Sequence, residues 1–420
     1  MRVSTILNAV EKHKSFVYRR VNWETRDGQK VLLVRIAPRK NTRPVCSCCG
    51  CKGRVHDRSK EPREFQFIPL WGIAVFFVYR MRRVNCSQCR AVRVEQLPWA
   101  EGKHPQTNSL RWFLADWAKS LSWQETARRF RVSWECVYRA VKFVVDWGLA
   151  QRDLSQVSAL GVDEVAWRRG HDYLTVVYEI GPGIKRLLSV ELGRTKDSLR
   201  QALDTLGTTT LQQVQFVASD MWSNYLEVIA ERLSQAVHVL DRFHIMQKFG
   251  KALDEIRASE VRALKQAGRE PLLKQTRYLL LKRPENLNPA QEIKLAELLK
   301  YNLKSVRGYL LKEDFQQFWD YVSPYFAGRF MDAWTQRAMR SQLAPLKDIA
   351  RMLRSHRELI LNWFKARKQF SSGSVEALNG NVKLVTKRAR GFRTLDAAKT
   401  ALLHVLGDLP TPKLTHRFCA

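Results

Sequence analysis

Residues 214–244 read VQFVASDMWSNYLEVIAERLSQAVHVLDRFH, and the fold class of the chain follows from this segment. Val214–Ser219 and Ala236–Leu240 are short runs with many β-branched residues, which is typical of buried strands. Between them, Ser223–Leu233 has the length and the apolar spacing of a helix. A strand–helix–strand order favours a sheet whose strands end at a common edge, where their side chains reach a ligand.

The residues before this segment extend the same pattern. Leu160–Trp167, His171–Tyr178 and Ile184–Leu192 are three further strand-like runs, and their short connections predict an antiparallel meander. The predicted helix Lys196–Leu206 then leads into the segment above. Three strands, helix, strand, helix and strand together predict an α/β fold.

Aspartates stand where a ligand would bind such a sheet. Asp163 lies near the middle of the first strand, whereas Asp220 and Asp241 directly follow the two later strands. We therefore expect the three carboxylates in one cleft. An aspartate at a strand end often caps the next helix instead, so Asp241 is a reserve ligand for which capping is the alternative role.

Residues 245–370 have an almost wholly helical pattern rich in Leu, Lys and Arg, which predicts an all-α insertion with a basic surface. Beyond it, Glu376, Asn379 and Lys383 fall on one face of a predicted helix, because they are spaced at i, i+3 and i+7. The opposite face is apolar and consists of Val375, Leu378, Val382 and Val385. A basic cluster follows around Gly391, and its members are Lys387, Arg388, Arg390 and Arg393. One carboxylate above several cations suits a site where the acid binds a metal and the cations hold phosphates.

The cysteines indicate a second metal site. The chain has eight, and six of them lie in the segment 46–89. Two Cys-x-x-Cys knuckles joined by strands supply the four thiolates of a structural Zn²⁺ site, and we expect as ligands Cys46, Cys49, Cys86 and Cys89. Gly50 favours this first pair because it permits a tight turn, but Cys48 with Cys51 is the competing pair. The alternative is a set of ordinary buried or redox-active thiols.

A helix-turn-helix is predicted between the cysteines and the sheet. The segment Pro98–Pro105 is a linker, and Leu110–Ser120 is a first helix. Ser122 begins a second helix with a capping box, and Ser133 caps a third helix that runs through Val144. The nearby cations that we expect to contact DNA are Arg128, Arg129, Arg131 and Arg139. An ordinary three-helix bundle has the same pattern, so the motif alone does not establish DNA binding.

The composition supports a polyanionic partner. The formal net charge is +32, and 45% of the residues are hydrophobic, so the chain has enough apolar residues to build real cores. The longest apolar run, Ile73–Tyr79, is too short to span a bilayer, and the N-terminus lacks an apolar signal block. We therefore expect a cytoplasmic protein with no membrane partner.

The acids suit phosphodiester chemistry. Two divalent ions catalyse this reaction when carboxylates hold them about 4 Å apart, and hard oxygen ligands select Mg²⁺ or Mn²⁺. Asp163, Asp220 and Glu376 meet that need on a strand, at a strand end and on a helix. Glu164 leaves open which acid faces the metal, although strand alternation puts it on the face opposite Asp163.

The order of these motifs resembles the DDE transposases of bacterial insertion sequences, specifically the ISL-three family, over residues 40–406. The residues that carry the resemblance are Gly161-Val162-Asp163-Glu164, Ser219-Asp220, Asp241-Arg242-Phe243-His244, and Glu376 with Asn379, Lys383, Arg388 and Gly391. The Asp-Arg-Phe-His segment, paired with the helix that contains Glu376, is its most specific part.

The resemblance implies an RNase H-like catalytic core that is interrupted by a helical insertion. It implies a metal-binding catalytic triad of Asp163, Asp220 and Glu376, with Asp241, Arg242, His244 and Asn379 in the vicinity, and DNA contacts from Lys383, Lys387, Arg388, Arg390 and Arg393. The implied domains are a zinc-ribbon domain (1–97), a helix-turn-helix domain (98–150), a first part of the core (151–244), the insertion (245–370), and a second part of the core with a basic C-terminal segment (371–420).

The implied function is that of a transposase that binds terminal inverted repeats and target DNA, and that cleaves and joins strands by hydrolysis and transesterification. A homodimer on DNA, associated with the nucleoid, is implied as well. The rival hypothesis is a DNA-binding regulator or an inactive transposase relative, which needs only the zinc ribbon, the helix-turn-helix and the charge. A metal-dependent nuclease that only hydrolyses DNA is a third reading.

Overall fold

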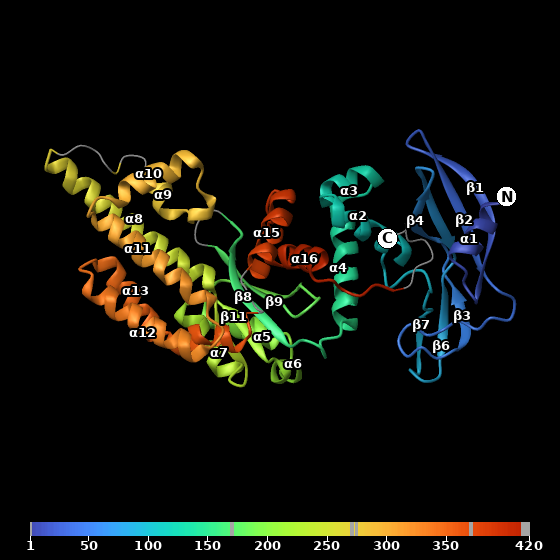
Figure 1. Cartoon of the computed structure of the whole chain (residues 1–420). Coiled ribbons are helices and arrows are strands. Elements are labelled where there is room, and N and C mark those ends of the chain that lie inside the picture. The colour runs from blue at the N-terminus through green and yellow to red at the C-terminus, as the bar shows by residue number, and fades with distance from the viewer. Residues whose placement is uncertain (1, 169–171, 269–272, 274–275, 369–372, 413–420) are drawn as a thin grey trace. The chain divides into compact units, whose positions relative to one another are not determined.

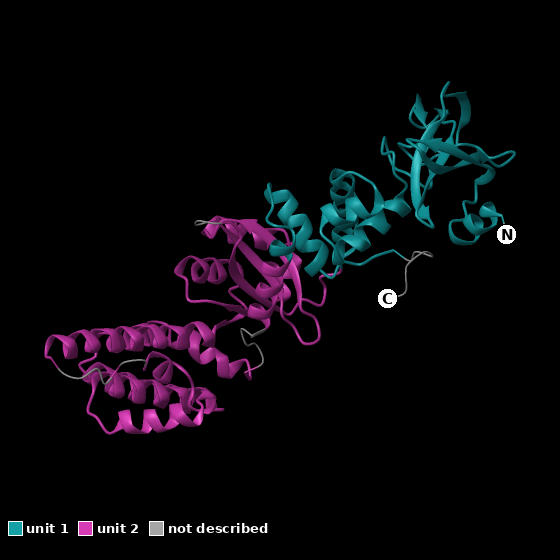
Figure 2. Ribbon diagram, turned by 90° about the horizontal axis from the view of Figure 1, so that it is seen from above, with its two compact units in different colours: residues 1–152, 385–420 teal, residues 153–384 magenta. Residues whose placement is uncertain are grey.

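The computed structural model of the chain comprises two compact units (Figures 1 and 2). The first combines residues 1–152 with 385–420, and the second consists of residues 153–384. The structure describes residues 2–168, 172–268, 273, 276–368 and 373–412. His171 and residues 371–372, which belong to predicted elements, and residues 413–420 of the predicted basic C-terminal segment lie outside that range.

The first unit begins with a β-rich part. Its elements are α1 (Val3–Val10), β1 (Phe16–Arg26), β2 (Gln29–Pro38), β3 (Arg54–Arg58), β4 (Arg63–Leu70), β5 (Ile73–Tyr79), β6 (Arg82–Cys86) and β7 (Ala91–Val94). One sheet has the order β1-β2-β5-β4, with β2 parallel to β5, and a second, antiparallel sheet has the order β3-β6-β7. The sequence predicted β-structure between the two cysteine knuckles, and the model confirms it.

An aromatic core holds the four-stranded sheet together. The buried indole of Trp99 lies edge-on to Phe16, Phe65 and Tyr79, with ring centroids 4.8, 6.2 and 5.5 Å away. Edge-to-face aromatic pairs at these distances add to the free energy gained by burial. Alternation along β5 turns every second side chain into this core.

Four helices complete the first unit, namely α2 (Asn108–Ser120), α3 (Trp123–Phe130), α4 (Trp134–Gln151) and α16 (Leu395–Leu406). Ser122 forms the predicted capping box with Glu125, and Ser133 caps α4 as expected. The third helix ends at Gln151 and not at Val144, because Val144, Val145 and Gly148 continue its buried face.

The second unit contains a five-stranded sheet of β8 (Ala159–Ala166), β9 (Tyr173–Glu179), β10 (Arg186–Leu192), β11 (Phe216–Ser219) and β12 (Val237–Leu240). Its order is β10-β9-β8-β11-β12, where the first three strands form the predicted antiparallel meander and the last two run parallel to β8. Between the strands lie α5 (Lys196–Asp204), α6 (Thr208–Gln213) and α7 (Ser223–Arg232). The mixed α/β class is therefore confirmed, whereas α6 was not predicted.

The two faces of this sheet are covered differently. Leu160 and Val162 on β8 join an apolar core with residues of α5 and α7. On the other face, Val375 of α15 (Gly373–Arg388) packs directly over Gly161. A Cβ at Gly161 would come within 2.8 Å of Val375, so the glycine permits the close approach of helix and strand.

The described residues between Arg242 and Lys365 form helices and the turns that connect them. The elements of this segment are α8 (Arg242–Gln266), α9 (Arg277–Leu281), η1 (Pro284–Asn286), α10 (Pro289–Leu299), α11 (Lys304–Gln316), η2 (Gln317–Asp320), α12 (Pro324–Arg340), α13 (Ala344–Ser355) and α14 (Arg357–Lys365). Trp319 and Trp334 are completely buried in it and pack edge-on against Phe315.

The two units join at two points of the chain. The boundary after Arg152 lies two residues from the predicted start of the catalytic core at 151. The second boundary falls inside α15, between Leu384 and Val385, whereas the sequence assigned all of 371–420 to the core. The segment after Leu384 packs in the first unit because α16 contacts α4.

Candidate active site and cysteine cluster

Strand register aligns three aspartates in the second unit. Gly161 of β8 pairs with Ala218 of β11, so two residues further along, Asp163 and Asp220 are level. Ser219 pairs with Leu240 of β12, so Asp220 and Asp241 are also level. The expected convergence of the acids thus follows from parallel pairing of β8, β11 and β12.

Asp163 is a half-buried carboxylate with two hydrogen-bond donors. Its Oδ1 accepts the backbone N–H of Glu164 at 2.8 Å, and its Oδ2 accepts the side-chain amide of Asn379 at 2.6 Å. Burial raises the pKa of Asp163 above its ordinary value, and the negative charge of Asp220 adds to this effect. The two donors and His244 act in the opposite direction. Burial and a like charge together disfavour ionisation unless a cation lies nearby.

Helix α15 reaches this carboxylate through an amide. The buried Tyr178 donates its hydroxyl to Asn379 Oδ1 at 2.7 Å, which fixes the amide so that its nitrogen faces Asp163. Glu376 lies one turn earlier on α15 and Lys383 one turn later, and both side chains are exposed. The helix therefore presents the predicted polar face of Glu376, Asn379 and Lys383.

Glu164 lies on the other face of β8, as strand alternation predicts. Its Oε1 accepts Arg194 at 3.4 Å, and its Oε2 is buried with no hydrogen-bond partner among the described residues. Burial raises the pKa of Glu164, and the charges of Asp220 and Asp163 raise it further. Glu164 is therefore a second half-buried acid of β8, on the face opposite Asp163, with one oxygen that lacks a hydrogen-bond partner among the described residues.

The segment after β12 serves partly as a helix cap. Asp241 accepts the backbone N–H of Phe243 at 2.6 Å and lies 3.5 Å from Nε2 of His244. Arg242 turns toward Trp319, with its guanidinium 5.3 Å from the ring centroid. The structural alternative proposed for Asp241, capping of the following helix, is therefore observed.

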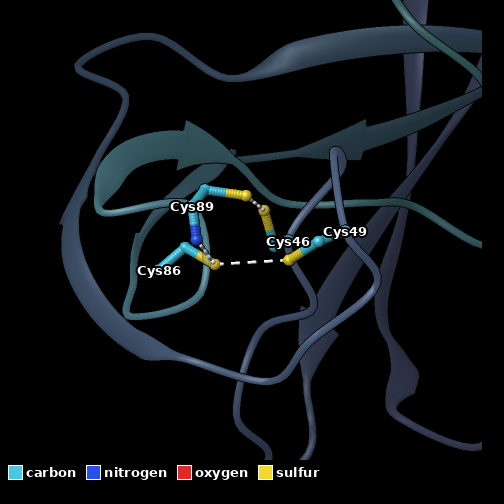
Figure 3. Close-up of side chains that lie close together, drawn as sticks. All are labelled: Cys46, Cys49, Cys86 and Cys89. Atoms are coloured by element: carbon cyan, nitrogen blue, oxygen red, sulfur yellow. Dashed lines mark hydrogen bonds between the residues drawn. The ribbon is translucent and has the colours of Figure 1, made fainter.

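Four cysteine sulfurs meet in the first unit (Figure 3). Cys46 and Cys89 have their sulfurs 3.9 Å apart, and Cys49 and Cys86 have theirs 3.4 Å apart. Tetrahedral Zn²⁺ with Zn–S bonds of 2.3 Å requires sulfurs about 3.8 Å apart, so the spacing fits. The structure thus gathers the favoured knuckle pair and leaves the side chains of the competing pair exposed; the latter are Cys48 and Cys51.

The thiols of this cluster have shifted ionisation. The backbone N–H groups of Cys49 and Cys48 lower the pKa of Cys46 to about 6. Hydrogen bonds with the neighbouring sulfurs, first that of Cys49, raise the pKa of Cys89. One thiol therefore ionises readily while its neighbour retains a proton, and a cation would be needed to hold all four as thiolates.

A buried ion pair supports the strand that carries the second knuckle. Arg82 and Glu95 have side chains that are 4% and 1% exposed, with Nη2 and Oε2 2.8 Å apart. Glu95 also accepts the hydroxyl of Tyr79 at 2.5 Å, and its backbone pairs with Cys46. This network fixes β6, which ends at Cys86, against the first knuckle.

The predicted helix-turn-helix cations have different surroundings. Arg128 and Arg129 are exposed on α3, whereas Arg131 donates to Gln29 and Arg139 pairs with Glu135. Arg131 has a left-handed backbone with φ of 54°, which ends α3 and begins the turn to α4. All four side chains are exposed, so these cations differ in their protein partners and not in their accessibility.

The candidate acidic ligands lie further apart than the four cysteine sulfurs. Among the residues that the structure describes, the four cysteines form the only set of three or more potential metal ligands whose atoms lie within 4.8 Å of one another. Asp163, Asp220 and Glu376 do not meet that distance. Ligands of two ions about 4 Å apart do not all bind the same ion, so the wider spacing is compatible with a two-metal site.

Comparison with known proteins decides the family. The sequence profile of the ISL-three DDE transposases, described as "Transposase", matches residues 160–402, more than half of the chain. The chain belongs to this transposase family. It is 29% identical over 377 residues to the transposase for insertion sequence element IS1001 of Bordetella parapertussis, covering 89% of this chain and 91% of that protein. It is 28% identical over 411 residues to the transposase for insertion sequence element IS1557 of Mycobacterium tuberculosis, covering 92% and 90%.

The family match confirms the resemblance drawn from the sequence motifs. The matched region of this transposase begins on β8 and ends on α16, so it includes Asp163, Asp220 and Glu376. Within the described part of the chain, no helix combines the length and hydrophobicity needed to cross a bilayer.

Sequence reasoning missed Tyr178 as a member of the candidate site. Tyr178 pairs with Gly161 in the β8–β9 register, so it lies beside the strand position that α15 approaches. Burial raises the pKa of Tyr178, and the charge of Asp163 raises it further, so its hydroxyl stays a donor to Asn379. A tyrosine near the end of the buried run 174–179 was the available signal.

Proposed function

We propose that this transposase binds the terminal inverted repeats of an insertion sequence and target DNA, and that it cleaves and joins strands by hydrolysis and transesterification. The catalytic core of the proposal is RNase H-like, formed by residues 151–244 and the Glu376 helix, with 245–370 inserted between them. Asp163, Asp220 and Glu376 are its proposed metal ligands, and a homodimer on DNA is its proposed active form.

One observation carries the proposal. Asp163 and Asp220 are level on neighbouring parallel strands, and the amide of Asn379 docks α15 on Asp163. Glu376 lies one turn before Asn379 on the same helix face, which supports its proposed role beside the two aspartates, although the helix follows them by more than 150 residues. A carboxylate from each of three separate elements is the arrangement that a two-ion phosphodiester site requires.

The side chains present fit divalent cations. The raised pKa of Asp163 reflects a cost of ionisation that a bound cation would offset. Carboxylate oxygens select Mg²⁺ or Mn²⁺ over softer metals. Bound there, such ions would activate the attacking oxygen and stabilise the leaving oxygen of the phosphodiester. The chain itself contributes the orientation of Asp163, through Tyr178 and Asn379.

The cysteine cluster fits structural Zn²⁺, since four sulfurs leave no open position for a substrate. The proposed DNA-binding part is the helix-turn-helix of 98–150, supported by the zinc ribbon of 1–97. The formal charge of +32 favours a polyanion, so DNA affinity should fall steeply as salt is raised.

The test is cleavage and strand joining on labelled DNA that carries the element's own end, with Mg²⁺ or Mn²⁺. Wild type should cut at the end and join it to a target, whereas Asp220→Asn should bind the end and not cut. Asp348→Asn is the matched control, because Asp348 is an exposed aspartate on α13 and its loss should leave both steps unchanged. Cleavage by Asp220→Asn at the wild-type rate would contradict the assignment.

A second outcome would favour the alternative function. If wild type binds the end but neither cuts nor joins DNA with either metal, a regulator or an inactive relative becomes the better account. If DNA is cut but never joined, the protein is a nuclease.

A further inference from the structure

The last part of the chain returns to the helices of the first unit. Residues 385–420 group with 1–152 (Figure 2). Within this unit, α16 packs against α4. Tyr138 and Lys142, both on α4, bind the carboxylate of Asp396 at the start of α16, and the Lys142 contact is 3.0 Å. A Cβ at Gly148 of α4 would lie 2.8 Å from Leu409, so this packing extends past α16.

The turn between α15 and α16 is fixed at the junction of α2 and α3. Arg388 donates to the backbone oxygen of Ser120 at 3.2 Å. Arg390 and Gly391 have φ of 55° and 90°, and the Gly391 N–H bonds back to Thr386 at 3.0 Å, which closes α15. A ring contact holds the far side of the turn, since the rings of Phe392 and Trp123 lie 6.3 Å apart.

This turn adds cations to those of α3. The exposed basic residues of the two segments are Arg128, Arg129, Lys387, Arg388, Arg390 and Arg393. The two segments are adjacent. Hydrogen bonds with Ser122 are the main cause of the lowered pKa of Glu125 on α3, and the charges of Arg128 on α3 and Arg390 in the turn lower that pKa further. We call these six residues the composite basic surface.

The acids nearby are occupied by protein groups. Glu125 accepts the backbone N–H and the hydroxyl of Ser122 at 2.9 and 2.7 Å as part of the capping box. Asp396 is held by Tyr138 and Lys142. The surface therefore has six cations and two acids, and both acids are already bonded to other protein groups. Its net charge is positive, which suits a row of phosphates.

We infer that the composite basic surface binds the phosphate backbone of the duplex at the transposon end, so that residues 387–393 serve end binding and not the active site. This inference rests on the proposed function. It differs from the expectation that Arg388 holds phosphates of the catalytic site, because Arg388 contacts Ser120 of α2 and the turn that follows contacts Trp123 of α3. Arginine and lysine contacts of this kind position the duplex and carry no sequence information.

The experiment compares full-length variants in binding and in cleavage of end DNA. Lys387→Gln/Arg390→Gln removes two charges from the composite basic surface. Arg329→Gln/Arg340→Gln removes two exposed charges from α12 and is the matched control. The first double variant should bind about tenfold more weakly or worse at moderate salt, and its slope of log affinity against log salt should be smaller by about 1.8. The control should match wild type in both quantities.

Cleavage measured under saturating protein separates end binding from catalysis. Lys387→Gln/Arg390→Gln should cut at the wild-type rate once bound, whereas Lys383→Gln should bind normally and cut slowly. Lys387→Arg/Arg390→Lys keeps the charge and should keep the wild-type salt slope, and thermal unfolding of each variant shows whether the turn still folds.

Two results would overturn the inference. Binding by Lys387→Gln/Arg390→Gln that equals the α12 control means that the turn does not contact the duplex. Normal binding with slow cleavage by the same variant assigns the turn to the active site. Both results leave the proposed function standing, whereas failure of wild type to bind any end DNA overturns the proposed function together with this inference.

Discussion

The contact between Asn379 and Asp163 gives the sharpest prediction. Asn379→Ala removes the amide that donates to Asp163 Oδ2 at 2.6 Å. A hydrogen bond to a charged group contributes about 1.5–3 kcal/mol, which corresponds to about 1–2 pKa units. The amide lowers the pKa of Asp163, so its loss should raise that pKa further. Because metal binding requires the ionised carboxylate, the acidic limb of the cleavage profile should move to higher pH by about 1–2 units.

The assay is single-turnover cleavage of end DNA across pH 5.5–9, repeated at several Mg²⁺ concentrations. Asn379→Ala should also need more Mg²⁺ at neutral pH, and raising either pH or Mg²⁺ should recover part of the rate. Tyr178→Phe is the graded companion, since it removes the donor to Asn379 at 2.7 Å and leaves the amide in place. A wild-type pH profile and Mg²⁺ requirement in Asn379→Ala would refute the claim that this amide tunes the carboxylate.

Three further predictions follow from burial and ligation. The double variant Cys48→Ser/Cys51→Ser should retain one Zn²⁺ per chain by elemental analysis, whereas Cys86→Ser should lose it. Folding raises the pKa of Asp163, so at pH values below the pKa of the unfolded chain the protonated carboxyl stabilises the folded state. This stabilisation is lost as the pH rises through the pKa that Asp163 has in the folded protein. Asp163→Asn should therefore raise the metal-free Tm at pH 7 by about 2–4 °C, if it recovers about 1 kcal/mol, and should abolish the rise in Tm that Mg²⁺ causes in wild type. Glu95→Gln should destabilise the first unit by about 3–5 kcal/mol in denaturant unfolding, because it leaves a buried guanidinium without its counter-charge.

Local patterns predicted the elements of the core well. The strands around Asp163, Asp220 and Asp241 were recognisable because buried strands are short β-branched runs between turn residues. Capping chemistry is local too, and so Ser122 and Ser133 marked the starts of two helices correctly. The polar face of α15 followed from helical spacing alone.

The remaining features depend on contacts between distant segments. Tyr178 joins the candidate site only through the pairing register of β8 with β9. The choice of Cys46 with Cys49 was a preference based on Gly50, and the sulfur positions that support it depend on how β6 packs on the first knuckle. The placement of α16 against α4 depends on surface complementarity across more than 240 residues, for which the sequence has no local signal.

The discontinuity of the first unit has a consequence during protein synthesis. A ribosome makes residues 1–152 first, then the whole of the second unit, and only afterwards the segment from Val385 onward. Until that segment emerges, α4 lacks the helix that packs on it, and the cations of α3 lack those of the turn. If the composite basic surface binds the transposon end as inferred above, a chain still on the ribosome lacks the part of that surface which the turn contributes.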